Sequence, residues 1–214
     1  MKGKVSKNKF LKVVLPALLV VAIICQAVGF QAVLAKGNVA TTSSDSISNL
    51  TDQQLQALTN PILQSYKADS SHKVWKMTDD SRLAVLANQT NIENARLQEV
   101  VKLVNSEFVE KEIISSPLAM VYAQEKDVSY GDILIDIDQT SSITSSSNSK
   151  EAYKITIGEN GVRLTGASEN AIMHGLRTIQ NLIITNDGLV YGEIVDYPNV
   201  AERRVHVDCA RKYI

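Results

Sequence analysis

The segment 151–183 reads EAYKITIGENGVRLTGASENAIMHGLRTIQNLI, and it decides the fold of this chain. Its first half alternates apolar and polar residues on both sides of Asn160-Gly161. This pattern predicts a β-hairpin, because Asn and Gly tolerate the positive φ of a tight turn. Its second half begins at Ser168, a residue type that caps helices through its hydroxyl. Apolar residues then recur at helical spacing, at Ile172, Leu176, Ile179 and Ile183. The segment predicts a hairpin and a helix packed on it, which indicates an α+β domain.

Other segments extend this domain, which we expect to cover residues 73–195. Short apolar runs within residues 74–86 predict two strands, and the apolar stripe of residues 92–110 predicts a second helix that begins after a cap at Asn91. The stripe consists of Leu97, Val101, Val104 and Phe108. We predict an α+β fold with a mainly antiparallel sheet, and with the 92–110 and 169–184 helices packed on one face.

The segment 131–138, GDILIDID, predicts another strand with two different faces. Its isoleucines share one face, whereas Asp132, Asp136 and Asp138 share the other. Carboxylates along one strand lie roughly 6–7 Å apart, and no calcium-loop pattern of glycine and bidentate glutamate follows. We therefore expect a solvated strand face and no calcium site.

Residues 1–35 have the pattern of a signal peptide. Five lysines precede a nearly continuous apolar run at 13–28, and Val33-Leu34-Ala35 fits a cleavage site with Lys36 as the mature start. The run is also long enough for an uncleaved membrane anchor, which stays open as an alternative. We expect a secreted or cell-surface protein that meets the membrane only through this segment if it is not cleaved. Residues 36–72 begin as a Ser/Thr-rich stretch, and we interpret them as a linker or N-terminal extension.

Composition excludes several functions. The formal net charge is −1, which gives no support for nucleic-acid binding. The histidines are His72, His174 and His206, and they form no His-Glu-x-x-His motif, so we predict no metal site and no cofactor. The nucleophile-elbow pattern Gly-x-Ser-x-Gly is also absent from the sequence.

The segment 151–183 closely resembles the part of family-20 β-N-acetylhexosaminidases that precedes their barrel. The shared positions are Glu151, Tyr153, Gly161, Ala167, Gly175, Thr178 and Leu182. The segment 194–214, IVDYPNVAERRVHVDCARKYI, resembles the family's continuation into the barrel. Here the shared positions are Asp196, Pro198, Arg203, Asp208, Arg211 and Tyr213. The chain departs from the family pattern at Ala171, Arg177 and Arg204. The resemblance covers roughly residues 73–214.

The resemblance implies a non-catalytic α+β domain followed by a (β/α)8 catalytic barrel, of which residues 196–214 are the truncated start. It implies hydrolysis of terminal N-acetylglucosamine or N-acetylgalactosamine from glycans, in which the acetamido group of the substrate attacks the anomeric carbon. The Asp-Glu pair that assists this reaction belongs to a later barrel strand, so no catalytic residue is expected here and the chain alone is predicted to be inactive. Arg211 matches the family arginine that binds the hydroxyls at carbons 3 and 4 of the terminal sugar.

A second hypothesis comes from a different functional class. The chain is then a complete, non-catalytic, secreted carbohydrate-binding or scaffold module. The alternating residues Val205, Val207 and Cys209 speak against this hypothesis, because a last strand without neighbours promotes aggregation.

Overall fold

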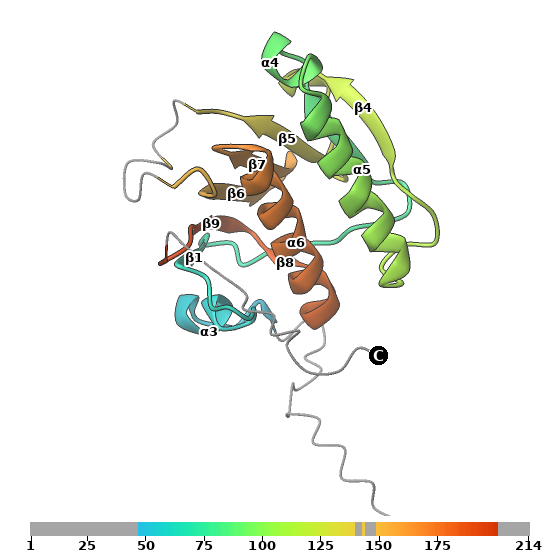
Figure 1. Cartoon of the computed structure of the whole chain (residues 1–214). Coiled ribbons are helices and arrows are strands. Elements are labelled where there is room, and N and C mark those ends of the chain that lie inside the picture. The colour runs from blue at the N-terminus through green and yellow to red at the C-terminus, as the bar shows by residue number, and fades with distance from the viewer. Residues whose placement is uncertain (1–46, 140–142, 144–148, 201–214) are drawn as a thin grey trace, which may run out of the picture. The chain divides into compact units, whose positions relative to one another are not determined.

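The computed structural model describes residues 47–139, 143 and 149–200 (Figure 1). Two long helices lie side by side and cover one face of a large sheet (Figure 1). The helices are α3 (Asp52–Gln56), α4 (Gln89–Ile92), α5 (Ala95–Glu110) and α6 (Glu169–Asn186), with a 3-10 turn η1 (Glu125–Asp127). The strands are β1 (Ser65–Ala68), β2 (Val74–Trp75), β3 (Arg82–Leu86), β4 (Ala119–Ala123), β5 (Ile133–Ile137), β6 (Tyr153–Gly158), β7 (Gly161–Gly166), β8 (Leu189–Val190) and β9 (Gly192–Asp196). This arrangement confirms the predicted α+β class.

The large sheet is mixed, with the strand order β1-β9-β6-β7-β5-β3-β4. The pairs β1-β9, β9-β6 and β6-β7 are antiparallel. The pairs β7-β5, β5-β3 and β3-β4 are parallel. The expected predominance of antiparallel pairing therefore holds for one half of the sheet. The reason lies in α5, which carries the chain across from β3 to β4, and a crossover of this kind joins parallel strands. Strands β2 and β8 form a separate antiparallel pair.

The segment 151–183 folds as the predicted hairpin and helix. Strands β6 and β7 pair antiparallel around a turn in which Gly161 has a φ of 89°. The Ser168 side chain accepts a hydrogen bond from the backbone N–H of Ala171 and caps α6. Leu176 and Ile179 of the predicted stripe are fully buried. Helix α6 packs on β6 and β7, and its neighbour α5 packs along it.

The second long helix begins later than predicted. Asn94 caps α5 by accepting from the N–H of Leu97, and Asn88 caps the separate short helix α4. Asn91, the expected cap, is instead buried. Its side-chain amide donates to Asp136 Oδ1 at 3.0 Å, and its Oδ1 accepts from the N–H of Ile137. Asn91 thus ties α4 to β5 rather than starting the helix.

The sheet also begins earlier than the predicted domain boundary at Lys73. Strand β1, which lies in the segment expected to be a linker, pairs with β9 from Ser65 to Ala68. Tyr66 is buried, and its hydroxyl donates to the carbonyl of Val190 at 2.8 Å. The folded unit therefore includes part of the predicted linker, because apolar residues between polar ones complete the sheet edge.

The expected solvated face of the strand at 131–138 is wrong for two of its three carboxylates. Asp132 and Asp136 are buried, because β5 lies inside the sheet between β3 and β7. The Arg82 guanidinium forms two hydrogen bonds to Asp132, at 2.9 and 2.6 Å. Burial raises the pKa of Asp132, but the hydrogen bonds from Arg82 and Ser129 outweigh it and lower that pKa to about 2. Asp132 and Asp136 therefore form structural ion pairs, with Arg82 and Arg163.

Several predictions concern residues outside the described ranges. The proposed signal peptide at 1–35 and the start of a barrel at 201–214, including Arg211, lie there. Within the described part of the chain, none of the helices has the length and apolar character needed to cross a membrane.

Candidate functional site

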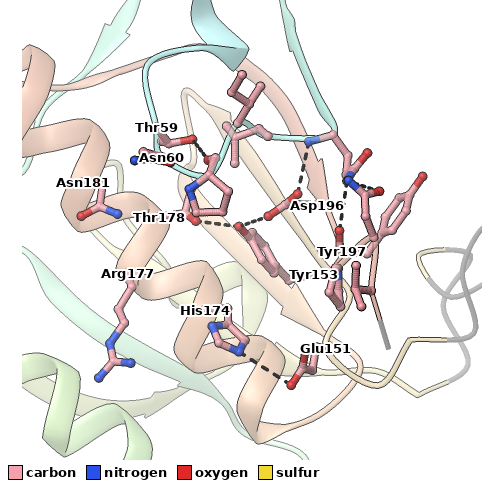
Figure 2. A pocket seen from close by; sticks show the side chains of 17 residues that line it. Thr59, Asn60, Glu151, Tyr153, His174, Arg177, Thr178, Asn181, Asp196 and Tyr197 are labelled. Atoms are coloured by element: carbon pink, nitrogen blue, oxygen red, sulfur yellow. Dashed lines mark hydrogen bonds and ion pairs between the residues drawn. The ribbon is translucent and has the colours of Figure 1, made fainter. Parts of the chain in front are cut away.

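A groove of about 460 Å³ lies where the loop before β1, helix α6 and the end of β9 meet. Its wall contains residues that the sequence analysis singled out for their match to a family, namely Glu151, Tyr153, Thr178, Asp196 and Pro198. Figure 2 shows Tyr153 of β6, Thr178 of α6 and Asp196 of β9 meeting in this groove, although their elements are far apart in the sequence. The groove adjoins the segment 197–200, through which the chain leaves the sheet.

The floor of the groove is a chain of hydrogen bonds centred on Tyr153 (Figure 2). The Tyr153 hydroxyl lies 2.6 Å from Thr178 Oγ1 and 2.8 Å from Asp196 Oδ2. Burial, followed by the charge of Asp196, raises the pKa of Tyr153 well above its usual value. Tyr153 therefore keeps its proton and donates a hydrogen bond to the Asp196 carboxylate. The cluster joins β6, α6 and the end of β9. The polar groups of Tyr153, Thr178 and Asp196 are hydrogen-bonded to one another.

Gln64 binds the segment through which the chain leaves β9. Its backbone N–H donates to Asp196 Oδ1 at 3.2 Å. Its side-chain amide donates to the carbonyl of Tyr197 at 3.3 Å and to Asn199 Oδ1 at 2.7 Å. Asp196 thus accepts hydrogen bonds on both oxygens, one from Tyr153 and one from Gln64. We refer to Gln64, Tyr153, Thr178, Asp196 and Asn199 as the exit clamp.

The remaining ionisable side chains of the groove lie close to partners of their own. Figure 2 shows His174 facing Glu151, with 4.0 Å between Nε2 and Oε1. Arg177 points away from Tyr153 in the same view, and its guanidinium forms two hydrogen bonds with Glu107 of α5, at 3.1 and 2.6 Å. The hydrogen bond from Arg177 lowers the pKa of Glu107. These contacts fix α6 against its neighbours.

This chemistry suits a structural joint better than a catalytic centre. General acid catalysis needs a group whose proton is transferred near neutral pH, whereas Tyr153 holds its proton far above that range. Among the described residues, histidine, cysteine, aspartate and glutamate side chains form no group of three or more that suits a metal ion.

Sequence reasoning found part of this site. The Asp196-Tyr197-Pro198 boundary and the position of Tyr153 were visible in the sequence. Gln64 was missed, because it lies in the polar stretch interpreted as a linker. Its only sequence signal is the short run Gln64-Ser65-Tyr66-Lys67-Ala68, in which a single tyrosine indicates a strand. Arg211, the one binding residue predicted, lies outside the described residues.

Comparison with known families gives one match over most of the described chain. The family model described as glycosyl hydrolase family 20, domain 2, matches residues 59–197. Its start agrees with the early beginning of the sheet, and its end coincides with the exit from β9. No curated protein matches this chain.

Solved structures of similar fold come from much longer proteins. The chain is similar to the chitobiase of Flavobacterium johnsoniae, with a TM-score of 0.51 and 15% identity, over 70% of this chain and 22% of that one. It is also similar to an N-acetyl-β-hexosaminidase of Streptomyces plicatus, with a TM-score of 0.49 and 16% identity, over 71% of this chain and 28% of that one. The chain thus spans about a quarter of the length of these two structures.

Proposed function

Since this chain belongs to glycosyl hydrolase family 20, we propose that it is the N-terminal part of a β-N-acetylhexosaminidase. The enzyme would remove terminal N-acetylglucosamine or N-acetylgalactosamine from glycans. The observation that carries this proposal is the family match over residues 59–197. The described α+β domain is the non-catalytic domain that precedes a barrel, and residues 196–214 begin that barrel.

The proposed reaction is retaining and substrate-assisted. The acetamido oxygen of the sugar attacks the anomeric carbon, an aspartate orients the acetamide, and a neighbouring glutamate protonates the leaving oxygen. The 214 residues contain no adjacent Asp-Glu pair. In this proposal the pair lies in the barrel, and the α+β domain supports that barrel.

A direct assay tests this proposal. The full-length polypeptide, extended through the barrel, should hydrolyse an aryl N-acetyl-β-glucosaminide with kcat in the ordinary enzyme range of roughly 1–10³ s⁻¹. The 214-residue chain should stay at the level of a buffer blank. Turnover by the 214-residue chain contradicts the assignment of catalysis to the barrel. A folded full-length protein without turnover, but with glycan affinity, favours the alternative of a binding module.

Arg211 is the proposed contact to the substrate within this sequence. A guanidinium offers several fixed donors to two adjacent hydroxyls and does not titrate. Replacing Arg211 by Ala in the full-length enzyme should lower kcat/KM at least about 10-fold, since hydrogen bonds to charged groups contribute roughly 1.5–3 kcal/mol each. Arg211→Lys should also be impaired, because it keeps the charge but loses the planar fork. A folded Arg211→Ala enzyme with wild-type kcat/KM contradicts this role.

We also propose that the enzyme is exported and acts outside the cell or at its surface. The support is the lysine-rich start, the apolar run and the small-residue site that ends at Ala35. N-terminal sequencing of the exported protein should give Lys36 as the first residue. A protein that retains Met1 and fractionates with membranes indicates an uncleaved anchor instead.

A further inference from the structure

We infer that the exit clamp positions the catalytic part of the enzyme, with Gln64 as its main positioning residue. The inference rests on the proposed function, because it concerns the segment that leads from β9 into the barrel. It goes further in naming residues of the α+β domain on which sugar binding depends. It starts from the contacts that hold residues 196–199 in place.

Gln64 donates hydrogen bonds to three groups within four consecutive residues. These are the carboxylate of Asp196, the carbonyl of Tyr197 and the side chain of Asn199. All three accept hydrogen bonds, and Gln64 supplies one donor to each through its backbone N–H and side-chain amide. The direction of the chain after β9 is therefore set from the start of β1, more than 130 residues away in sequence.

Tyr153 is a second anchor of the segment 196–199. Tyr153, which is buried, donates to the other oxygen of Asp196 and also contacts Thr178 of α6. Asp196 is thereby held from two sides, by β6 and by the start of β1. The arrangement leaves the last residue of β9 little freedom to rotate, although a plain strand end needs no such support.

This support has a functional reason within the proposed enzyme. Pro198 limits the backbone within the clamped segment, and Arg211 follows Asn199 by only twelve residues. A shift in the exit direction moves the first barrel strand relative to the rest of the barrel. Misplacing a binding group by about 1 Å costs on the order of 100-fold in rate. A clamp made of side-chain hydrogen bonds thus acts through Arg211 rather than on the sugar itself.

The test is kinetic and uses the full-length enzyme with an aryl N-acetyl-β-glucosaminide. Gln64→Glu keeps the length of the side chain but turns its donor into an acceptor that faces two acceptors. We expect kcat/KM to fall at least about threefold, mainly through a higher KM, because the misplaced arginine binds both ground and transition states. Gln64→Lys retains a hydrogen-bond donor, so this variant should keep most of the wild-type kcat/KM. The matched control is Gln53→Glu, the same change at an exposed glutamine of α3.

Folding is checked by circular dichroism at the assay temperature and by thermal melts. Asn199→Ala provides an independent variant, since it removes one acceptor from an exposed residue without touching the core. A loss of kcat/KM in folded Gln64→Glu and Asn199→Ala enzymes, with an unchanged Gln53→Glu enzyme, supports the inference. Wild-type kcat/KM in these two folded variants overturns it and makes the clamp purely structural. A folded wild-type enzyme without turnover contradicts the proposed function itself, and the inference falls with it.

Discussion

At the scale of single residues, the pair of Arg82 and Asp132 shows how a strand buries a carboxylate. The Asp132 side chain is 1% exposed, and Ser129 adds two hydrogen bonds of 2.8 Å, from its N–H and its hydroxyl. Removing one partner of a buried pair leaves an uncompensated charge, which costs more than the pair contributes. Asp132 therefore stabilises the fold only together with Arg82.

Asp132 should make the protein less stable in acid. Its folded pKa of about 2 lies below the value of 3.8 for the free side chain. The stabilisation is therefore present above pH 3.8 and is lost as the pH falls towards 2. The shift corresponds to about 2 kcal/mol. Urea unfolding at several pH values should show a flatter acid dependence for Asp132→Asn than for the wild type. The same slope in both proteins contradicts the pairing.

The sequence alone identified the strand but not the state of its carboxylates. Alternation in 131–138 is visible in one dimension, whereas the partners come from β3 and β7. Asp136 depends on Asn88 and Asn91, which lie more than 40 residues earlier. Which strands become neighbours is decided by the order of the whole sheet, so solvated and buried carboxylates look the same in the sequence.

At the scale of elements, α6 is defined by its packing against the hairpin. A Cβ at Gly175 would lie 2.3 Å from Leu164 Cδ1 and 3.2 Å from Tyr153 Cδ2. Leu164 is fully buried and has little room to move. The absence of a side chain thus allows the helix to approach β6 and β7. The apolar stripe was readable from the sequence, but this close approach was not.

Gly175→Ala should destabilise the protein although alanine favours helices. The helix propensity gains about 1 kcal/mol, whereas overpacking a core costs typically 1–3 kcal/mol. We expect a net loss of free energy of unfolding, measured by denaturant titration. The control is Gly158→Ala, where an added Cβ meets nothing within 4 Å. A more stable Gly175→Ala protein contradicts the close packing of α6.

Leu176→Ala tests the buried stripe of the same helix. Leu176 is 0% exposed, so the substitution should cost roughly 2–5 kcal/mol in free energy of unfolding. Ile184→Ala is the matched control within α6, since Ile184 is 55% exposed. It should stay within about 0.5 kcal/mol. Equal costs at both sites are incompatible with the assigned face.

At the scale of the whole molecule, the domain depends on a strand that composition did not reveal. The segment before Lys73 contributes Leu55, Leu63 and Tyr66 to the hydrophobic core, and β1 covers the edge of β9. Residues 36–72 are polar on average, and this average conceals the few apolar residues of the short strand β1. The class of fold and the family resemblance follow from local patterns, whereas the domain boundary depends on which edge the sheet needs covered.

A chain that starts at Lys73 should therefore be much less stable than one that starts at Lys36. The loss of buried Leu63 and Tyr66 side chains alone removes roughly 4 kcal/mol of hydrophobic stabilisation. Thermal melts of the two chains should differ clearly, and the shorter chain should aggregate through the uncovered β9 edge. Equal melting temperatures would show that β1 adds nothing to the domain.

We propose that this domain belongs to an enzyme in which the acetamido group of the substrate takes part in the reaction. The most direct measurement compares kcat/KM of the full-length enzyme for an aryl N-acetyl-β-glucosaminide and for the matching aryl β-glucoside, which lacks the acetamide. Substrate assistance predicts turnover of the first and at least roughly 100-fold lower kcat/KM for the second, a difference of about 2.7 kcal/mol in transition-state stabilisation. Equal kcat/KM for both sugars would contradict the account.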